Sequence, residues 1–157
     1  MLLLLGVMSF ASTALGHPCS NVGAAIVVHV SERRLWLCDQ GGASKEFAVA
    51  LGKGGVGKVT EGDQKTPLGD YWLGQPRASK EFGTFIPIGY PTEEQRKRGA
   101  TGGDVGIHGP KRGFAWTGRM GTWINWTRGC IAVATDAAIL EIAGWVRAQK
   151  SVAIHIE

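Results

Sequence analysis

Short apolar runs separated by polar turns make up most of the chain, and this pattern predicts a mostly β fold. The first three runs, residues 25–30, 35–38 and 46–51, have strand length, and turns at 31–33 and 39–42 separate them. Because these connections have hairpin length, we expect the three runs to form an antiparallel meander. Further strands are predicted at 70–73, 84–90, 131–133 and 151–156.

Two stretches carry helix signals instead. In residues 92–99, Thr92 is a good N-cap, acidic residues fill the first turn, basic residues fill the last, and Gly99 ends the helix. Thr135 caps a second helix with Asp136 in its first turn. The apolar stripe of this helix consists of Ile139, Leu140, Ile142, Ala143 and Val146. We therefore expect a β-sandwich or partly closed barrel with a C-terminal helix and one short helix.

The first 16 residues differ from the rest of the chain. They carry no charged side chain and end in Ala14-Leu15-Gly16, the small-x-small pattern that signal peptidase prefers. Residues 1–16 are therefore predicted to be a signal peptide for export to the periplasm or cell wall, with membrane association only if the leader is retained. A buried N-terminal strand or helix is the alternative. Residues 17–157 show no repeat or linker, which indicates one domain.

Composition and motifs exclude several classes of function. With 44% hydrophobic and 19% charged residues the chain is globular, and its net charge of +4 suits an anionic partner such as a cell-wall polymer. Residues 52–58 have the glycines and lysine of a phosphate-binding loop, but Val59 replaces the magnesium-binding Ser or Thr and no helix pattern follows. Metal-ligand spacings and a basic stripe are missing from the sequence. We expect no cofactor, no metal and no nucleic-acid partner.

One histidine and one cysteine, His108 and Cys130, each lie beside a glycine at the edge of a short apolar run. The 21 residues between them include five glycines, three tryptophans and four basic residues, without a clean helical or strand period. Long connections of this kind are uncommon in compact domains and are often functional. The pattern suggests a nucleophilic cysteine and a histidine base under a basic, aromatic loop.

The chemistry of a thiol explains why this pair is of interest. Only the thiolate is a good nucleophile, so a catalytic Cys130 needs a base, and His108 is the candidate. Gly129 permits a tight turn, and the amides of Gly129 and Cys130 are candidate donors to an oxyanion. Alternatively, Cys130 is a small buried apolar side chain, as most free cysteines are. Cys19 and Cys38 are an even pair for which a disulfide is possible, although sequence cannot supply the geometry.

Two motifs resemble the YkuD-type L,D-transpeptidases. Ile107-His108-Gly109 and Trp126-Thr127-Arg128-Gly129-Cys130-Ile131-Ala132-Val133 are similar to the active-site signature of that family, in the branch that reads Thr-x-Gly-Cys-Ile-Ala. Upstream, residues 61–71 are similar to its Gly-Asp-x-x-Thr-Pro-x-Gly-x-Tyr segment. The resemblance covers residues 25–156. The chain departs from the better-known signature at Thr127-Arg128, where that form has Ser-His, and at Ala132, where Asn or Arg is usual.

The resemblance implies a YkuD-like catalytic domain and a specific reaction. Cys130 would attack the amide that precedes the terminal D-Ala of a peptidoglycan stem tetrapeptide, and the thioester would pass to an amine of a neighbouring stem as a 3→3 crosslink. His108 would be the general base, and the carbonyl of Gly109 would orient it. From the loop itself, candidate substrate-binding residues are Arg128, Thr127, Trp126 and Arg112. Alternatively, Arg112 is a solvated loop charge and Trp126 anchors the loop into the core.

Two other functions fit the same sequence. A murein L,D-carboxypeptidase or endopeptidase would form the same thioester and give it to water, or would release a wall-linked lipoprotein. A non-catalytic wall-binding module would need no reactive thiol. The variant Thr127-Arg128 motif keeps the hydrolase in consideration.

Overall fold

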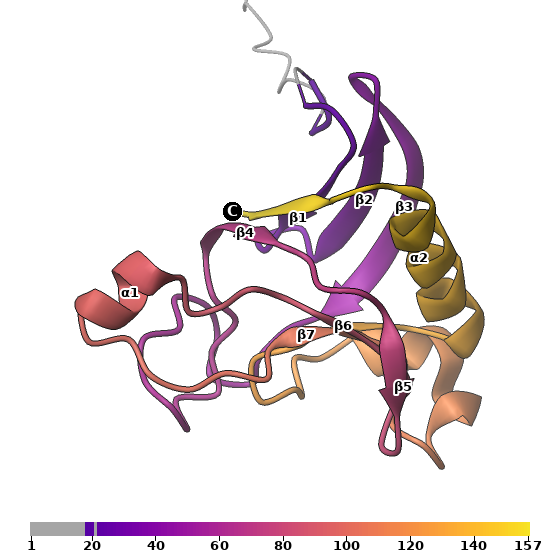
Figure 1. Cartoon of the computed structure of the whole chain (residues 1–157). Coiled ribbons are helices and arrows are strands. Elements are labelled where there is room, and N and C mark those ends of the chain that lie inside the picture. The colour runs from indigo at the N-terminus through magenta and orange to yellow at the C-terminus, as the bar shows by residue number, and fades with distance from the viewer. Residues whose placement is uncertain (1–17, 21) are drawn as a thin grey trace, which may run out of the picture.

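A single strongly curled sheet forms the centre of the protein in the computed structural model (Figure 1). The structure describes residues 18–20 and 22–157, so the predicted leader at 1–16 lies outside the described residues. Over the described part of the chain, nine strands lie in the order β4-β9-β1-β2-β3-β8-β7-β6-β5. The strands are β1 (Ala25–His29), β2 (Arg34–Asp39), β3 (Gly42–Ala50), β4 (Gly69–Trp72), β5 (Arg77–Ser79), β6 (Gly83–Pro87), β7 (Gly106–His108), β8 (Ile131–Val133) and β9 (Ala153–Ile156).

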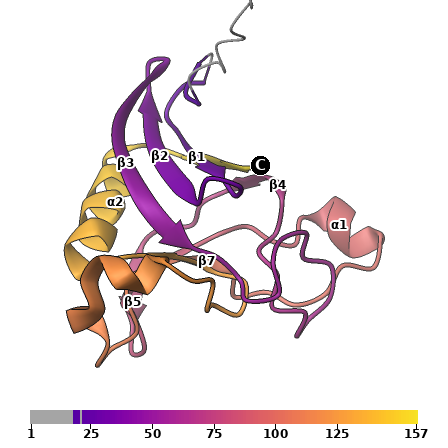
Figure 2. The ribbon, with the colours of Figure 1, turned by 180° about the vertical axis from the view of Figure 1, so that it is seen from behind.

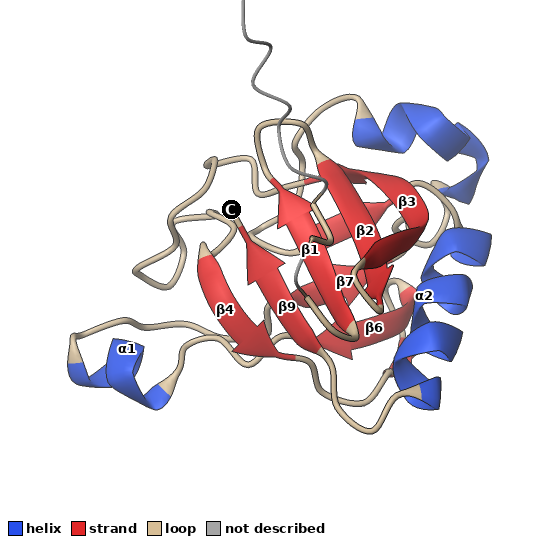
Figure 3. Cartoon of the chain, turned by 90° about the horizontal axis from the view of Figure 1, so that it is seen from above, coloured by secondary structure: helices blue, strands red, loops and turns tan. Residues whose placement is uncertain are grey.

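Strand β3 joins the two halves of the sheet. Its first part pairs with β2, whereas its last residues, Val49 and Ala50, pair with β8. The halves therefore lie over one another, as the view in Figure 3 shows. Away from β3, the two halves also meet where Leu73 and Ile88 form an antiparallel bridge between the segments that follow β4 and β6. The predicted partly closed barrel and the β1-β2-β3 meander are both confirmed.

The helices lie outside the sheet. Helix α1 (Glu93–Lys97) begins after Thr92, whose hydroxyl and backbone form the predicted cap with Gln95. It projects at the end of the molecule opposite to α2 (Asp136–Ala148), which begins after Thr135 (Figures 1 and 2). A 3₁₀ segment, η1 (Ala115–Thr122), lies inside the long connection between β7 and β8. No helix in the described ranges is long and apolar enough to cross a membrane.

The main core fills the space between the two halves of the sheet and α2. Alternate residues of the strands supply it, such as Ile26 of β1, Ile154 of β9 and Ile131 of β8, all fully buried. Helix α2 packs against β6 and β8 through Ile139, Ile142, Ala143 and Val146. Leu140 was predicted in the same stripe but is 56% exposed, because one residue along a helix turns the side chain about 100° away from Ile139.

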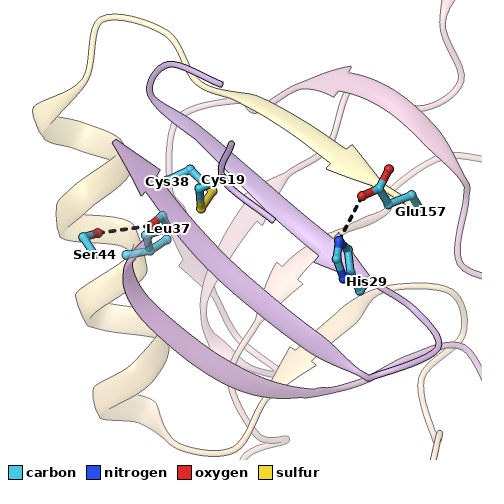
Figure 4. The surroundings of a disulfide bond; sticks show 6 residues. All are labelled: Cys19, His29, Leu37, Cys38, Ser44 and Glu157. Carbon is cyan, nitrogen blue, oxygen red and sulfur yellow. Dashed lines mark hydrogen bonds and ion pairs between the residues drawn. A yellow bond between two sulfur atoms is a disulfide. The ribbon is translucent and has the colours of Figure 1, made fainter. Parts of the chain in front are cut away.

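A small second cluster covers the outer face of β1 and β2. Val27 and Trp36 pack there with Val22 and the disulfide that joins Cys19 to Cys38 (Figure 4). The disulfide that the sequence left open is therefore present in the structure. It ties the segment before β1 to β2, which leaves Cys130 as the free cysteine of the chain.

Pro87 ends the interior strand β6. Strand β6 lies between β5 and β7. Pairing with β5 stops at Phe85, so the missing N–H of Pro87 costs no hydrogen bond on that side. Pro87 pairs with Gly106 of β7, and its carbonyl accepts a hydrogen bond from the N–H of Gly74.

Candidate functional site

The parallel pairing of β7 with β8 brings His108 and Cys130 to the same face. Ile107 is opposite Ile131, and both side chains are fully buried in the core. Because side chains alternate along a strand, the neighbours His108 and Cys130 point away from that core. Both line one cleft of about 490 Å³. The long connection from β7 to β8 therefore returns the cysteine to the side of the histidine.

The wall of this cleft is aromatic and charged. Its aromatic side chains are Phe82, Phe85 and Trp126. The basic residues are Arg77, Lys111 and Arg128, and the acidic ones are Glu81 and Asp104. A site with three cations and two carboxylates suits a ligand that itself carries carboxylates together with a smaller positive charge.

His108 is fixed in one tautomer. Its Nδ1 lies 2.7 Å from the carbonyl oxygen of Gly109. A carbonyl can only accept, so Nδ1 carries the hydrogen and Nε2 keeps the lone pair of a base. The ring of Phe82 stacks on the imidazole with centroids 3.7 Å apart, and Trp126 meets it edge-on. The orientation of the imidazole is therefore set from both its polar edge and its face.

Burial also tunes the basicity of His108. The side chain is 1% exposed, and this desolvation lowers its pKa below the ordinary value of 6.5, against the opposing effects of the Gly109 carbonyl and Glu81. The imidazole is therefore neutral, and able to take a proton, at pH 7.

Gly109 also allows α2 to approach the site. A Cβ at this position would lie 2.9 Å from Cγ2 of Ile139, closer than real contacts allow. The strand that carries His108 thus packs directly against the first turns of α2, and a side chain at 109 would push the two apart.

Cys130 is a thiol rather than a thiolate at rest. Burial raises its pKa above the ordinary value of 9.0, and the nearby carboxylates of Asp104 and Glu81 raise it further, whereas the backbone of Gly106 and the ammonium of Lys58 act in the opposite direction. Its Sγ lies 3.5 Å from the carbonyl oxygen of Asp104, in a geometry in which the S–H donates. A nucleophilic Cys130 therefore needs a base at the moment of attack.

This state gives a measurable prediction. Alkylation of Cys130 by iodoacetamide should be slower at pH 7 than that of an unstructured cysteine peptide, and its rate should rise at a higher pH, because only the thiolate reacts. The other two cysteines are held in the disulfide and do not react. A rate that is already maximal at pH 7 would mean that a preformed thiolate pairs with a charged imidazole.

The turn before Cys130 is closed by Thr127. Its hydroxyl donates to the carbonyl of Cys130 at 2.6 Å and accepts from the N–H of Gly129 at 3.1 Å. Gly129 has φ +126°, and a Cβ there would lie 2.7 Å from the carbonyl oxygen of Lys65. Only glycine fits this close approach. Thr127 lines the cleft, but its hydroxyl is used to shape the turn, and one of the two candidate oxyanion donors is already engaged.

The upstream motif, residues 61–71, packs against this turn. Asp63 accepts hydrogen bonds from the ammonium of Lys58 at 2.9 Å and from three backbone N–H groups, those of Val59, Thr60 and Lys65. Although partial burial raises the pKa of the Asp63 carboxyl, these donors hold it well below its usual range. The Lys65 carbonyl is the group that faces Gly129. Lys58 is thus a buried partner of Asp63, which argues against the phosphate-loop interpretation.

Removal of the Lys58 ammonium should destabilise the fold. We expect Lys58→Ala to lower the free energy of unfolding by about 3 kcal/mol, because it leaves the Asp63 carboxylate without its charged partner in a poorly hydrated place. Lys45→Ala, which breaks the exposed pair with Glu141, is the matched control and should cost less than about 1 kcal/mol. Urea denaturation of both variants makes the comparison, and equal stabilities would contradict a structural role for Lys58.

The structure gathers most of the predicted site residues in the cleft but not Arg112. Arg128 and Trp126 line the cleft with the Cys/His pair. Arg112 instead lines a separate hollow beside α2, and its backbone N–H donates to the carbonyl of Glu81.

The residues that sequence reasoning missed come from the β5–β6 hairpin. Arg77, Glu81 and Phe82 reach the cleft through the pairing of β6 with β7, far from His108 along the chain. Their segment has no motif of its own. The only local sequence signal for a site is Phe82 beside Glu81, and this signal is weak.

Comparison with known proteins agrees with the fold. The YkuD family model, described as an L,D-transpeptidase catalytic domain, matches residues 23–154. The helical cell shape determining protein Pgp2 from Campylobacter jejuni is 26% identical with a TM-score of 0.67, over 85% of this chain and 46% of that one. Bd1075 from Bdellovibrio bacteriovorus shares the fold at 20% identity and TM-score 0.62, over 88% of this chain and 50% of that one.

A third structure covers the catalytic domain alone. The domain of the Enterococcus faecium L,D-transpeptidase is 16% identical with a TM-score of 0.56, and the alignment covers 85% of this chain and 96% of that one. The chain thus spans about half the length of Pgp2 and Bd1075. No curated protein matches it. Because the family match spans most of the sequence, this chain belongs to the YkuD family of L,D-transpeptidase catalytic domains, whose members modify peptidoglycan.

Proposed function

We propose that the protein is a peptidoglycan L,D-transpeptidase that forms 3→3 crosslinks through a thioester on Cys130. The observation that carries the proposal is the placement of two groups. His108 and Cys130 lie on one face of paired strands, and the Nδ1 contact with Gly109 leaves Nε2 of His108 as an acceptor. Because the Gly109 carbonyl orients the imidazole, this pair needs no acidic side chain as a third catalytic group.

Acylation follows from the protonation states of the pair. Nε2 of His108 takes the thiol proton as Sγ of Cys130 attacks the carbonyl carbon of the third stem residue. The tetrahedral intermediate then collapses, the C–N bond to D-Ala breaks, and the imidazolium returns its proton to the leaving amine. D-Alanine departs and a thioester remains on Cys130.

Transfer runs through the same groups in reverse. The amine of a neighbouring stem attacks the thioester carbonyl and loses a proton to Nε2 of His108. The C–S bond breaks, and the imidazolium protonates the departing sulfur. The new amide is the 3→3 crosslink, and both residues return to their starting states.

The oxyanion of each intermediate needs hydrogen-bond donors. The N–H of Gly129 is directed at the hydroxyl of Thr127, so of the two candidate amides the N–H of Cys130 is the one that we assign to the oxyanion. Thr127 acts as a positioning residue in this scheme, because it fixes the turn that presents both the amide and the sulfur.

Charges around the cleft suit the stem peptide. The donor carries a carboxylate on D-Ala and another on diaminopimelate, and Arg128, Arg77 and Lys111 line the cleft that would receive them. Trp126 forms an apolar part of the wall. Arg112 lies in a separate hollow and has no role in this scheme.

We also infer export to the periplasm or cell wall. The Cys19–Cys38 disulfide supports this location, since such bonds persist in oxidising compartments, and so does the leader predicted at 1–16. The substrate is found there as well. Membrane attachment through a retained leader is part of the same proposal.

Hydrolysis of the thioester is the second candidate. It is favoured by the Arg128 position, where the better-known signature has histidine, and by the open cleft that leaves Cys130 only half-buried. Water would then replace the acceptor amine, and the enzyme would shorten stems or release a wall-linked lipoprotein. The similarity to a cell shape determining protein fits either outcome.

Analysis of products separates these functions. With disaccharide-tetrapeptide as donor and acceptor, we expect D-alanine and 3→3 linked dimers, detected by mass spectrometry after chromatography. Tripeptide without dimers would replace transfer by hydrolysis. No product from a protein whose thiol still reacts with iodoacetamide would contradict both reactions with this donor.

A further inference from the structure

The segment from residue 114 to 124 exposes large apolar side chains. We call these side chains the aromatic ledge: Phe114, Trp116, Met120, Trp123 and Ile124. Trp116 is 76% exposed and Trp123 is 66% exposed. The ledge surrounds η1, which lies beside α2 and outside the sheet (Figures 1 and 3). Exposed apolar groups gathered in one segment mark interaction surfaces more often than chance, so the ledge is a candidate interaction surface.

Hydrogen bonds to other parts of the chain hold the backbone of the ledge in place. The guanidinium of Arg33 donates to the carbonyl of Trp123 at 2.7 Å, and the indole N–H of Trp126 donates to the carbonyl of Gly121 at 2.8 Å. These bonds anchor the segment to the β1–β2 turn and to the cleft wall. The apolar side chains are therefore presented outward by a preformed support.

The connection that carries the ledge is basic. From Val105 to Thr135 the sequence contains no carboxylate side chain, whereas it contains four cations. These cations are Lys111, Arg112, Arg119 and Arg128. Glu81 of the β5–β6 hairpin forms an ion pair with Lys111. The ledge is thus an apolar surface on a connection whose own charges are all positive, and an anionic partner complements it.

We propose that the aromatic ledge docks the protein on an anionic lipid surface. Tryptophan prefers the interface between headgroups and acyl chains, aliphatic side chains such as Met120 and Ile124 insert below it, and nearby lysines and arginines are attracted to anionic headgroups. A two-fold dimer through the ledge would bring equal positive charges together. A sugar chain would stack on the indole rings but would leave Met120 and Ile124 exposed to water.

Docking in this way would place the cleft next to the membrane. Lys111 and Trp126 line both the Cys130 cleft and the hollow formed with Phe114, Met120 and Ile124. The two surfaces are therefore adjacent. This inference goes beyond the proposed reaction and does not depend on it, because it concerns where the domain sits and not what the cysteine does.

Tryptophan quenching in the full-length protein tests the proposal locally. The probe is vesicles of phosphatidylcholine and phosphatidylglycerol with brominated acyl chains, which quench only tryptophans that reach them. The combined variant Trp116→Ser, Trp123→Ser should lose the quenching seen with the wild-type chain. Trp72→Ser is the matched control, since Trp72 is 64% exposed on β4, outside the ledge, and this variant should be quenched as the wild type is.

Hydrogen exchange on the same vesicles gives the second readout. We expect the anionic vesicles to protect the backbone amides of residues 114–124 from exchange. This protection should weaken at high salt and should be weaker on vesicles of phosphatidylcholine alone. Quenching that survives in the double variant would place the membrane contact elsewhere, for example on residues 1–16, and would overturn the proposal. So would protection of 114–124 that rises with protein concentration without vesicles, protection by glycan strands alone, or no quenching in any chain.

Discussion

Replacement of Cys130 by alanine will abolish the release of D-alanine from a disaccharide-tetrapeptide, with a loss of at least about 10⁴-fold. The proposed route has no other nucleophile, because the remaining cysteines form the Cys19–Cys38 disulfide. A coupled D-amino acid oxidase assay of the released D-alanine measures the effect.

The fold should survive this change. Cys130 is half-buried, and its side chain makes only two interactions that alanine would lose, the S–H hydrogen bond to the carbonyl of Asp104 and the contact with the backbone of Gly106. We therefore expect the circular dichroism spectrum and the urea midpoint of Cys130→Ala to stay close to those of the wild type. Activity retained in a folded Cys130→Ala protein would contradict the thioester mechanism.

Replacement of His108 by glutamine will lower the rate of acylation by about 10²- to 10⁴-fold, the usual contribution of a general base. The wild-type rate should rise with pH as His108 loses its proton, and burial places this rise below pH 6.5, the ordinary pKa of histidine. The variant should lack this limb of the profile, because glutamine does not titrate. Stopped-flow measurement of acylation from pH 4 to 8 gives both results.

The matched control for this variant is on the outer face of the sheet. His155 of β9 pairs with Asp70 and lies outside the cleft. His155→Gln should keep both the rate and the acidic limb of the profile. If His108→Gln kept the acidic limb while losing rate, the titrating base would be a different group, and His108 would have a role in positioning only.

Most of the fold could be predicted because its signals are local. Hairpin-length turns identify the β1-β2-β3 meander, and the caps at Thr92 and Thr135 identify both α-helices. The curl of the sheet was harder to predict from the sequence, because it depends on β3 pairing with β2 along one part and with β8 along another. The three-residue strand β5 was missed because so short a segment has no periodicity of its own.

The candidate site was predictable only where residues lie in or beside a motif. His108 and Cys130 were proposed from their motifs, and their common face follows from the parallel register. Phe82, which stacks on His108, was not found, because its position depends on tertiary pairing of β6 with β7. Arg112 was placed in the site by its nearness in sequence, but the chain turns it into another hollow.

Motif resemblance also left the roles of supporting residues open. Thr127 was a candidate for substrate binding, whereas its hydroxyl bridges Cys130 and Gly129. Asp63 is part of the upstream motif, and its contacts with Lys58 and three amides explain the need for a carboxylate at that position. Such roles depend on which donors the folded backbone presents, and sequence alone does not give them.

The mass of the intact protein after mixing with disaccharide-tetrapeptide is the most direct test of the central claim. The thioester mechanism predicts a gain equal to the donor minus D-alanine, located on Cys130 by peptide mapping and absent from Cys130→Ala. Free D-alanine without any adduct in the wild-type chain, under rapid acid quenching, would contradict an acyl-enzyme. An adduct on a residue other than Cys130 would contradict the assignment of the nucleophile.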